Sequence, residues 1–304
     1  MSMPRRQKRQ AGRHARVDGI PFDMPVNSED SPALMAGFTC DGDAAQALLP
    51  GNDLHALRLP NGRAVLIVTV IDYRTTDIGK YVEYSIALAC TMGAKRRGLI
   101  SAVLRMKRAG TGQYVWDLPV SSLISVKGGK GIWGMPKHQA NLDFRVDEHS
   151  MSSQYDLDGK LCMRITVERP RGLKVPLNKL GAVNWCQFRG MLMKSSIYFS
   201  DQAEVAVGPR AKATLLIGDH PRMDPLRTLD LASKPIFTAC LPHSHGVLDD
   251  HFESWFVTSP NTIEPDARWG GDDLTSVVGL PNSTDWLDPP AASGRLAAAQ
   301  LVDS

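Results

Sequence analysis

One lysine in a glycine-rich, apolar stretch is the residue of this chain best placed to do chemistry. Lys137 follows Pro136 in residues 128–140, which read GGKGIWGMPKHQA, and its apolar neighbours include Trp133 and Met135. Because proline fixes its own φ and pushes the preceding residue toward an extended conformation, we expect a stiff segment to present the lysine. Apolar surroundings disfavour the charged amine and lower its pKa, and a neutral amine can form a Schiff base with a ketone. The plainer alternative is a turn from which Lys137 reaches solvent.

A carboxylate upstream is a candidate for the proton transfers that imine chemistry needs. Glu83 lies in residues 81–84, which read YVEY and are typical of a strand. On a strand, Tyr81 and Glu83 share one face, opposite Val82 and Tyr84. That face is either solvated or turned toward the lysine, where Glu83 would act as a general acid–base.

These segments resemble the active-site sequences of the acetoacetate decarboxylase superfamily. Residues 134–137 (GMPK) are similar to the family's Gly-x-Pro-Lys, and residues 81–84 are similar to its Tyr-x-Glu strand. Residues 38–50 resemble its early strand and the helix that ends at a proline, and residues 208–226 resemble its C-terminal part. The pieces keep the family's order over residues 35–258, so the chain is identified as a divergent member.

The resemblance implies that Lys137 forms the Schiff base and that Glu83 is the carboxylate beside it. The decarboxylase is the standard case of a lysine activated by desolvation or by a cationic neighbour, so this mechanism comes from the resemblance alone. His138 stands where the decarboxylase has a second lysine, and we expect it to tune Lys137 or to shuttle protons. Ser31 and Val68 stand near the places of a family arginine and a further glutamate, so we do not expect acetoacetate itself as the substrate.

Four further residues are candidates for substrate contacts. Trp133, Met135 and Tyr81 lie in the two matched segments, although Trp133 and Met135 are equally suited to packing. Arg210, which follows Gly208-Pro209, is a candidate partner for a substrate carboxylate.

The function expected from these residues is Schiff-base chemistry on a keto acid or another carbonyl compound. The iminium would act as an electron sink for decarboxylation, or for aldol or dehydration chemistry of the lyase type. No cofactor is expected. The alternative is a non-catalytic small-molecule binding or assembly module on the same fold. As partners we expect the carbonyl substrate and further copies of the chain, and neither nucleic acid nor membrane.

The composition is that of an ordinary globular protein. The chain has 304 residues, 43% of them hydrophobic and 22% charged, and it has no apolar run near the length of a membrane span. Six arginines and lysines within residues 1–16 account for much of the net charge of +3, so the remaining chain is close to neutral and does not read as a nucleic-acid binder. The five widely spaced cysteines and the absence of a secretory signal predict a reduced, cytoplasmic protein.

Strand patterns dominate the chain, and the connections between them are short. We therefore expect an α+β protein dominated by antiparallel sheet, closed into a barrel or packed as a sandwich, which agrees with the family's β-cone. The expected domains are a basic arm and extended lead-in (1–34), the decarboxylase-like domain (35–258) and a tail rich in Pro, Gly and Ala (259–304). Within the domain, the patterns predict the following elements: a helix ending at Pro50, a strand over 99–108, a helix over 119–127 stopped by Gly128, a hairpin at Asp158-Gly159, a loop over 169–184 and a helix over 247–257.

Three clustered histidines offer a different chemistry. His243 and His245 would share one face of a strand, and His251 with an aspartate could complete a metal shell. The structural alternative is a strand end followed by the first turn of a helix. Since the resembled family needs no metal, we assign no metal ligands.

Overall fold

The computed structural model describes residues 11–93, 111–171, 174–249 and 251–258. The predicted strand over 99–108 and the tail from 259 onward lie outside these residues. The strands are β1 (His14–Val17), β2 (Ile20–Asp23), β3 (Val26–Cys40), β4 (Leu54–Ala56), β5 (Ala64–Tyr73), β6 (Thr75–Thr76), β7 (Tyr81–Met92), β8 (Thr111–Val120), β9 (Lys137–Gln139), β10 (Asn141–Leu142), β11 (Arg145–Val146), β12 (Ser150–Leu157), β13 (Lys160–Glu168), β14 (Lys174–Phe188), β15 (Met191–Val207), β16 (Ala213–Ile217), β17 (Pro235–Leu248) and β18 (Glu253–Phe256). The helices are α1 (Gly42–Ala47), α3 (Leu123–Trp133) and α4 (Asp224–Arg227), with 3-10 turns η2 (Gly208–Arg210) and η3 (Pro221–Met223).

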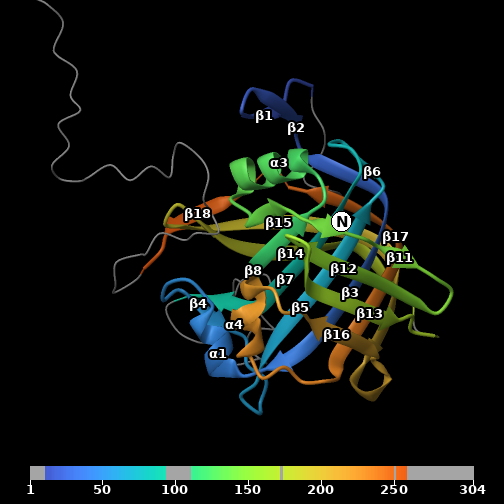
Figure 1. Cartoon of the computed structure of the whole chain (residues 1–304). Helices are drawn as coiled ribbons and strands as arrows, with labels where there is room; N and C mark the ends of the chain where they lie inside the picture. The colour runs from blue at the N-terminus through green and yellow to red at the C-terminus, as the bar shows by residue number, and fades with distance from the viewer. Residues whose placement is uncertain (1–10, 94–110, 172–173, 250, 259–304) are drawn as a thin grey trace, which may run out of the picture. The chain divides into compact units, whose positions relative to one another are not determined.

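Seven strands form a closed barrel (Figure 1). Their order is β7-β5-β3-β17-β15-β14-β8, and β8 pairs back to β7, which closes the sheet. All neighbours in the ring are antiparallel except β14 and β8, whose parallel contact is only two residue pairs long. The short strand β9 adds to β8 in parallel at the edge of this wall. The prediction of a barrel dominated by antiparallel sheet is confirmed.

One apolar cluster identifies the inner face of the barrel. It contains residues from all seven strands of the ring, namely Ala33, Ile71, Tyr81, Val120, Leu177, Ala203 and Leu241. The opposite face of the same strands, which carries Leu34 and Tyr84, packs against a second sheet, and the inside of a seven-stranded barrel has room for side chains but not for another sheet. The inner face therefore includes Tyr81 and, by strand alternation, Glu83.

A second sheet covers part of the outer face. It is built from β10, β11, β12, β13 and β16, and its fully buried side chains, such as Tyr155 and Met163, pack in one core with Leu34 and Tyr84 of the barrel. The predicted hairpin between β12 and β13 is confirmed, because Leu157 pairs with Lys160 across a turn in which both central residues have positive φ. Alternation of buried residues along β12 fixes which side of this sheet meets the barrel.

The predicted helices and loops are partly corrected. The helix before Pro50 is confirmed as α1, where the Asp41 carboxylate accepts hydrogen bonds from the first backbone N–H groups. The loop expected over 169–184 is wrong, since β14 begins at Lys174 and pairs with β15 across most of that segment. The helix expected over 247–257 is also wrong, because β17 continues to Leu248 and β18 follows. In both places pairing with β15, which no local pattern reveals, decides the conformation.

The helix that leads to the lysine is longer than its glycines predict. Instead of stopping at Gly128, α3 continues to Trp133 and ends at Gly134, which adopts the left-handed conformation (φ 65°) of a helix C-terminus. The glycines serve close packing, since a Cβ at Gly128 would lie 2.8 Å from the Phe22 ring. The helix lies between β1 and strands β8, β9 and β15 (Figure 1).

Residues 26–34, expected as an extended lead-in, form the first part of β3. The division of the chain into three segments stays a prediction. No helix within the described residues is long and apolar enough to cross a membrane.

Candidate active site

The register of neighbouring strands brings Lys137 and Glu83 to the same side of the barrel wall. Lys137 pairs with Leu118 of β8, and Val120 of the same strand pairs with Glu83 of β7. Since side chains alternate along a strand, Leu118, Val120, Lys137 and Glu83 all point to the inner face. Lys137 Nζ lies 2.7 Å from Glu83 Oε2, and the two side chains are only 4% and 14% exposed. The two residues expected to act together therefore form a nearly enclosed ion pair.

Hydroxyl and aromatic groups complete the surroundings of the amine. Lys137 Nζ donates a hydrogen bond of 2.9 Å to Ser125 Oγ, which α3 supplies. The same Nζ lies 5.4 Å from the centroid of the Tyr81 ring, within the range of a cation–π contact. Tyr73 stacks on Tyr81 with ring centroids 4.6 Å apart. The amine is thus held by one carboxylate, one hydroxyl and one aromatic face.

Both tyrosines are neutral hydrogen-bonding groups at physiological pH. Burial raises the pKa of Tyr73 and of Tyr81 well above the usual value, and the negative charge of Glu83 raises both further. Within the described part of the chain, Lys137 and Glu83 are therefore the charged groups in contact at the amine. Such a pair can move a proton from the ammonium to the carboxylate and so release a nucleophilic amine.

The close approach of α3 to the lysine depends on Gly129. A Cβ at this position would lie 2.4 Å from Lys137 Cδ and 2.6 Å from Cε. Gly129 lies one helical turn after Ser125, so a single face of α3 both supports the lysine chain and binds its amine. This contact fixes the side chain between helix and barrel wall.

We expect Gly129→Ala to displace the lysine side chain and to weaken its contacts with Glu83 and Ser125. Reductive trapping of a carbonyl compound at Lys137 should slow by roughly 10-fold to 100-fold, because a displacement of about 1 Å at a reacting group costs up to that much. The matched control is Gly131→Ala, whose Cβ would press on Val17 instead. Equal trapping rates in the two variants, measured by peptide mass spectrometry, would contradict this role.

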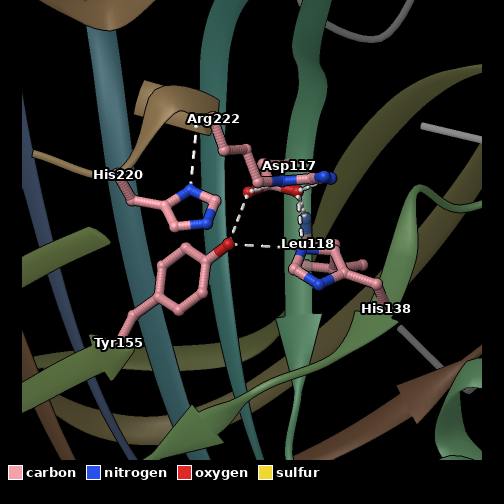
Figure 2. A network of polar contacts seen from close by, with 6 residues as sticks. All are labelled: Asp117, Leu118, His138, Tyr155, His220 and Arg222. Atoms are coloured by element: carbon pink, nitrogen blue, oxygen red, sulfur yellow. Dashed lines mark hydrogen bonds and ion pairs between the residues drawn. The ribbon is translucent and has the colours of Figure 1, made fainter. Parts of the chain in front are cut away.

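His138 points to the opposite side of β9 and belongs to a second polar network (Figure 2). His138 Nε2 lies 3.0 Å from Asp117 Oδ1, and Arg222 donates two hydrogen bonds of 2.8 and 3.0 Å to the same carboxylate. The Tyr155 hydroxyl reaches Asp117 Oδ2 at 3.3 Å, and His220 Nδ1 accepts from the Arg222 backbone. Figure 2 shows His138, Tyr155 and Arg222 converging on Asp117, with His220 beside Arg222. The expected role of His138 toward Lys137 stays a prediction, since no side-chain contact between them is recorded in the described residues.

Asp117 is a fully buried charge that its neighbours keep ionised. Burial by itself would raise the pKa of this carboxyl, but hydrogen bonds from His138 and Arg222 outweigh it and hold the pKa at about 2. The pKa of Arg222 is correspondingly raised, since the bonds to Asp117 outweigh the effect of burial. The network joins β8 and β9 to β12 of the second sheet and to η3, so it braces the strand that carries Lys137.

The remaining predicted site residues lie apart from the amine contacts. Trp133 is buried, and its Nε1 donates to the Asp249 carbonyl at 3.0 Å. Met135 packs in the same apolar cluster as Trp133, which also includes Leu118. Arg210 ends η2 with an exposed side chain, and no contact with Lys137 is recorded for it in the described residues. Their expected substrate contacts stay predictions.

The histidine cluster is not gathered around one point. His243 is exposed and pairs with Asp30 at 3.0 Å, and the strand β17 runs through both His243 and His245. Among the described residues no three His, Cys, Asp or Glu side chains are placed to hold a metal ion.

Sequence reasoning missed Ser125, Tyr73 and Asp117. Tyr73 could have been found, since it continues the apolar strand of β5 two residues beyond Ile71 and therefore shares its face. Asp117 could also have been found, because an acidic residue within an apolar strand requires a buried hydrogen-bonding or charged partner. Ser125 lies twelve residues before Lys137, and only the packing of α3 against β9 brings the two together.

A family model described as acetoacetate decarboxylase matches residues 3–191. Among curated proteins none matches significantly. A solved acetoacetate decarboxylase has a TM-score of 0.55 and 14% identity, over 76% of this chain and 89% of that chain.

A second group of similar structures is the enduracididine biosynthesis enzyme MppR. The structure with HEPES buffer bound has a TM-score of 0.55 and 13% identity, over 77% of this chain and 89% of that chain. The structure complexed with pyruvate has a TM-score of 0.51 and 14% identity, over 76% of this chain and 90% of that chain. At these identities the likeness shows a shared fold.

Proposed function

The chain belongs to the acetoacetate decarboxylase family, and we propose that it is a lyase that forms an imine between Lys137 and a carbonyl substrate. Membership supports an enzyme acting on a carbonyl compound. The proposal that Lys137 forms an imine rests on the enclosed pair of Lys137 Nζ and Glu83 Oε2, which lie 2.7 Å apart on the inner face of the barrel.

In the proposed reaction, Glu83 transfers protons and Lys137 is the nucleophile. Glu83 accepts a proton from the lysine ammonium, and the free amine attacks the carbonyl carbon to give a carbinolamine. The protonated carboxyl then returns its proton to the departing hydroxyl, and water leaves with formation of the iminium. The C=N⁺ bond of the iminium withdraws electrons from the adjacent carbon, which favours cleavage or proton loss there. Ser125 and the Tyr81 ring hold the nitrogen throughout.

The test is reductive trapping with a panel of ketones, aldehydes and keto acids, followed by peptide mass spectrometry. We expect a mass gain on Lys137 that is lost in Lys137→Ala. The matched control is Lys127→Ala, which removes an amine of α3 that pairs with Asp18 and should leave trapping intact. If no carbonyl compound traps at Lys137 faster than at exposed lysines, the proposal fails and a binding or assembly module becomes the better interpretation.

A further inference from the structure

We infer that the substrate carries no charge next to its reacting carbonyl, so that a neutral ketone or aldehyde, and not a keto acid, condenses with Lys137. This inference rests on the proposed function. It follows from the charges that face the amine in the part of the chain that the structure describes.

The inner face already balances its own charges. The cation of the site is Lys137 and the anion is Glu83, 2.7 Å away. Imine formation keeps this balance, because the iminium nitrogen carries the same positive charge as the ammonium that it replaces. A substrate carboxylate would add a second negative charge beside Glu83, in surroundings where charges are poorly screened.

Among the described residues, the neighbours of the pair offer no further positive charge. The inner cluster is apolar around Ile71, Val120 and Leu241, with Tyr73 and Tyr81 as its polar members. Burial and the charge of Glu83 keep both tyrosines protonated. A keto acid bound here would therefore leave its carboxylate without a cationic partner among the described residues of the inner face.

Four half-buried arginines of the described chain are committed to other carboxylates. Arg58 pairs with Asp43, Arg63 with Asp230, Arg169 with Glu204 and Arg222 with Asp117, and the exposed Arg74 pairs with Asp72. Arginine is the side chain best suited to bind a carboxylate through two hydrogen bonds. Freeing any of them would leave its acidic partner unpaired, which is costly for the buried pairs.

The polar groups deeper on the same face suit a neutral substrate. Ser85 of β7 pairs with Thr69 of β5. Each lies two residues along its strand from the pair of Glu83 and Ile71, and so on the same face. Both side chains are buried, at 9% and 8% exposure, and the Thr69 hydroxyl has no hydrogen-bond partner among the residues that the structure describes. Hydroxyls can bind an uncharged carbonyl or hydroxyl oxygen. The reaction that follows imine formation is then aldol-type or dehydration chemistry, because a neutral substrate has no carboxylate to lose.

The experiment compares matched pairs of carbonyl compounds that differ only in charge. Pyruvate is compared with pyruvamide, and 4-oxopentanoate with 4-oxopentanamide, by reductive trapping and peptide mass spectrometry. Exposed Lys160 in the same sample reports the intrinsic reactivity of each compound. We expect the amide-to-acid ratio at Lys137 to exceed that at Lys160 by about 10-fold or more, as expected for a like charge a few ångströms away.

Two variants separate charge from structure. Glu83→Gln removes the negative charge and should bring the amide-to-acid ratio at Lys137 toward that at Lys160, whatever happens to the absolute rate. Ser125→Ala removes a neutral contact of the same amine and should leave the ratio unchanged. Equal ratios at Lys137 and Lys160, or preference for the acids, would overturn the inference and leave the proposed function standing. Failure of all four compounds to trap at Lys137 above the Lys160 level would overturn both.

Discussion

Glu83→Gln is expected to slow imine formation at Lys137 by about 100-fold, within the range that a positioned general acid–base contributes. Glu83 Oε2 lies 2.7 Å from Lys137 Nζ and is the carboxylate oxygen in contact with that amine. An amide can neither accept the ammonium proton nor return one to the departing hydroxyl. The measurement is the initial rate of reductive trapping with the best neutral ketone at pH 7.

A second carboxylate variant provides the control for this effect. Asp72→Asn removes the acidic group directly before the inner-face tyrosine Tyr73. This carboxylate pairs with Arg74 and not with the lysine, and trapping should stay within about 2-fold to 3-fold of the parent rate. An unchanged or faster rate in Glu83→Gln would mean that the carboxylate merely keeps the amine protonated. In that case Glu83 has no part in the proton transfers.

Asp117→Asn is expected to destabilise the protein by about 3–5 kcal/mol, the usual cost of leaving a buried charge unpaired. The carboxylate is fully buried and accepts two hydrogen bonds from Arg222. Its loss therefore leaves the guanidinium without its anionic partner. Denaturant unfolding of parent and variant measures the difference. The surface pair of Asp224 and Arg227 supplies the control, since Asp224→Asn should cost less than about 1 kcal/mol.

The same carboxylate predicts a pH dependence of stability. The pKa of Asp117 is about 2 in the folded protein, against 3.8 for an ordinary aspartate. Because the folded-state pKa is the lower one, this group stabilises the fold fully above about pH 4, and its contribution is lost as the pH falls toward 2. The loss amounts to about 2 kcal/mol at 1.36 kcal/mol per pKa unit. Asp117→Asn should remove this part of the acid transition, and an unaltered transition would contradict the assignment.

Residue types and spacing were enough to predict the barrel and the family. Strand patterns with short connections predicted an antiparallel sheet that closes into a barrel or packs as a sandwich. The family resemblance favoured the barrel, and the barrel is confirmed. The resemblance carried by Gly134 to Lys137 and by residues 81–84 is confirmed by the family match over residues 3–191. Local patterns at α1 and at the turn of Asp158 and Gly159 were also sufficient, because caps and turns depend on neighbouring residues.

Other features depended on contacts between distant segments. The glycines of residues 128–131 predicted a helix stop, yet α3 runs through them because Phe22, Val17 and Lys137 pack where a Cβ would lie. Residues 174–184 and 253–256 became strands through pairing with β15. Neither kind of contact is visible in a local pattern, since each partner lies far along the chain.

Lys137 and Glu83 could be predicted as site residues from the sequence, because both stand in the two matched segments. Their contact depends on the tertiary structure. The register of β7, β8 and β9 sets Glu83 and Lys137 on the inner face and sends His138 to Asp117 on the outer face. The packing of α3 against β9 brings Ser125 to the site, and the pairing of β5 with β7 brings Tyr73 beside Tyr81. Strand alternation gives each side chain one of two directions, and only the closure of the barrel makes one of those directions the inside.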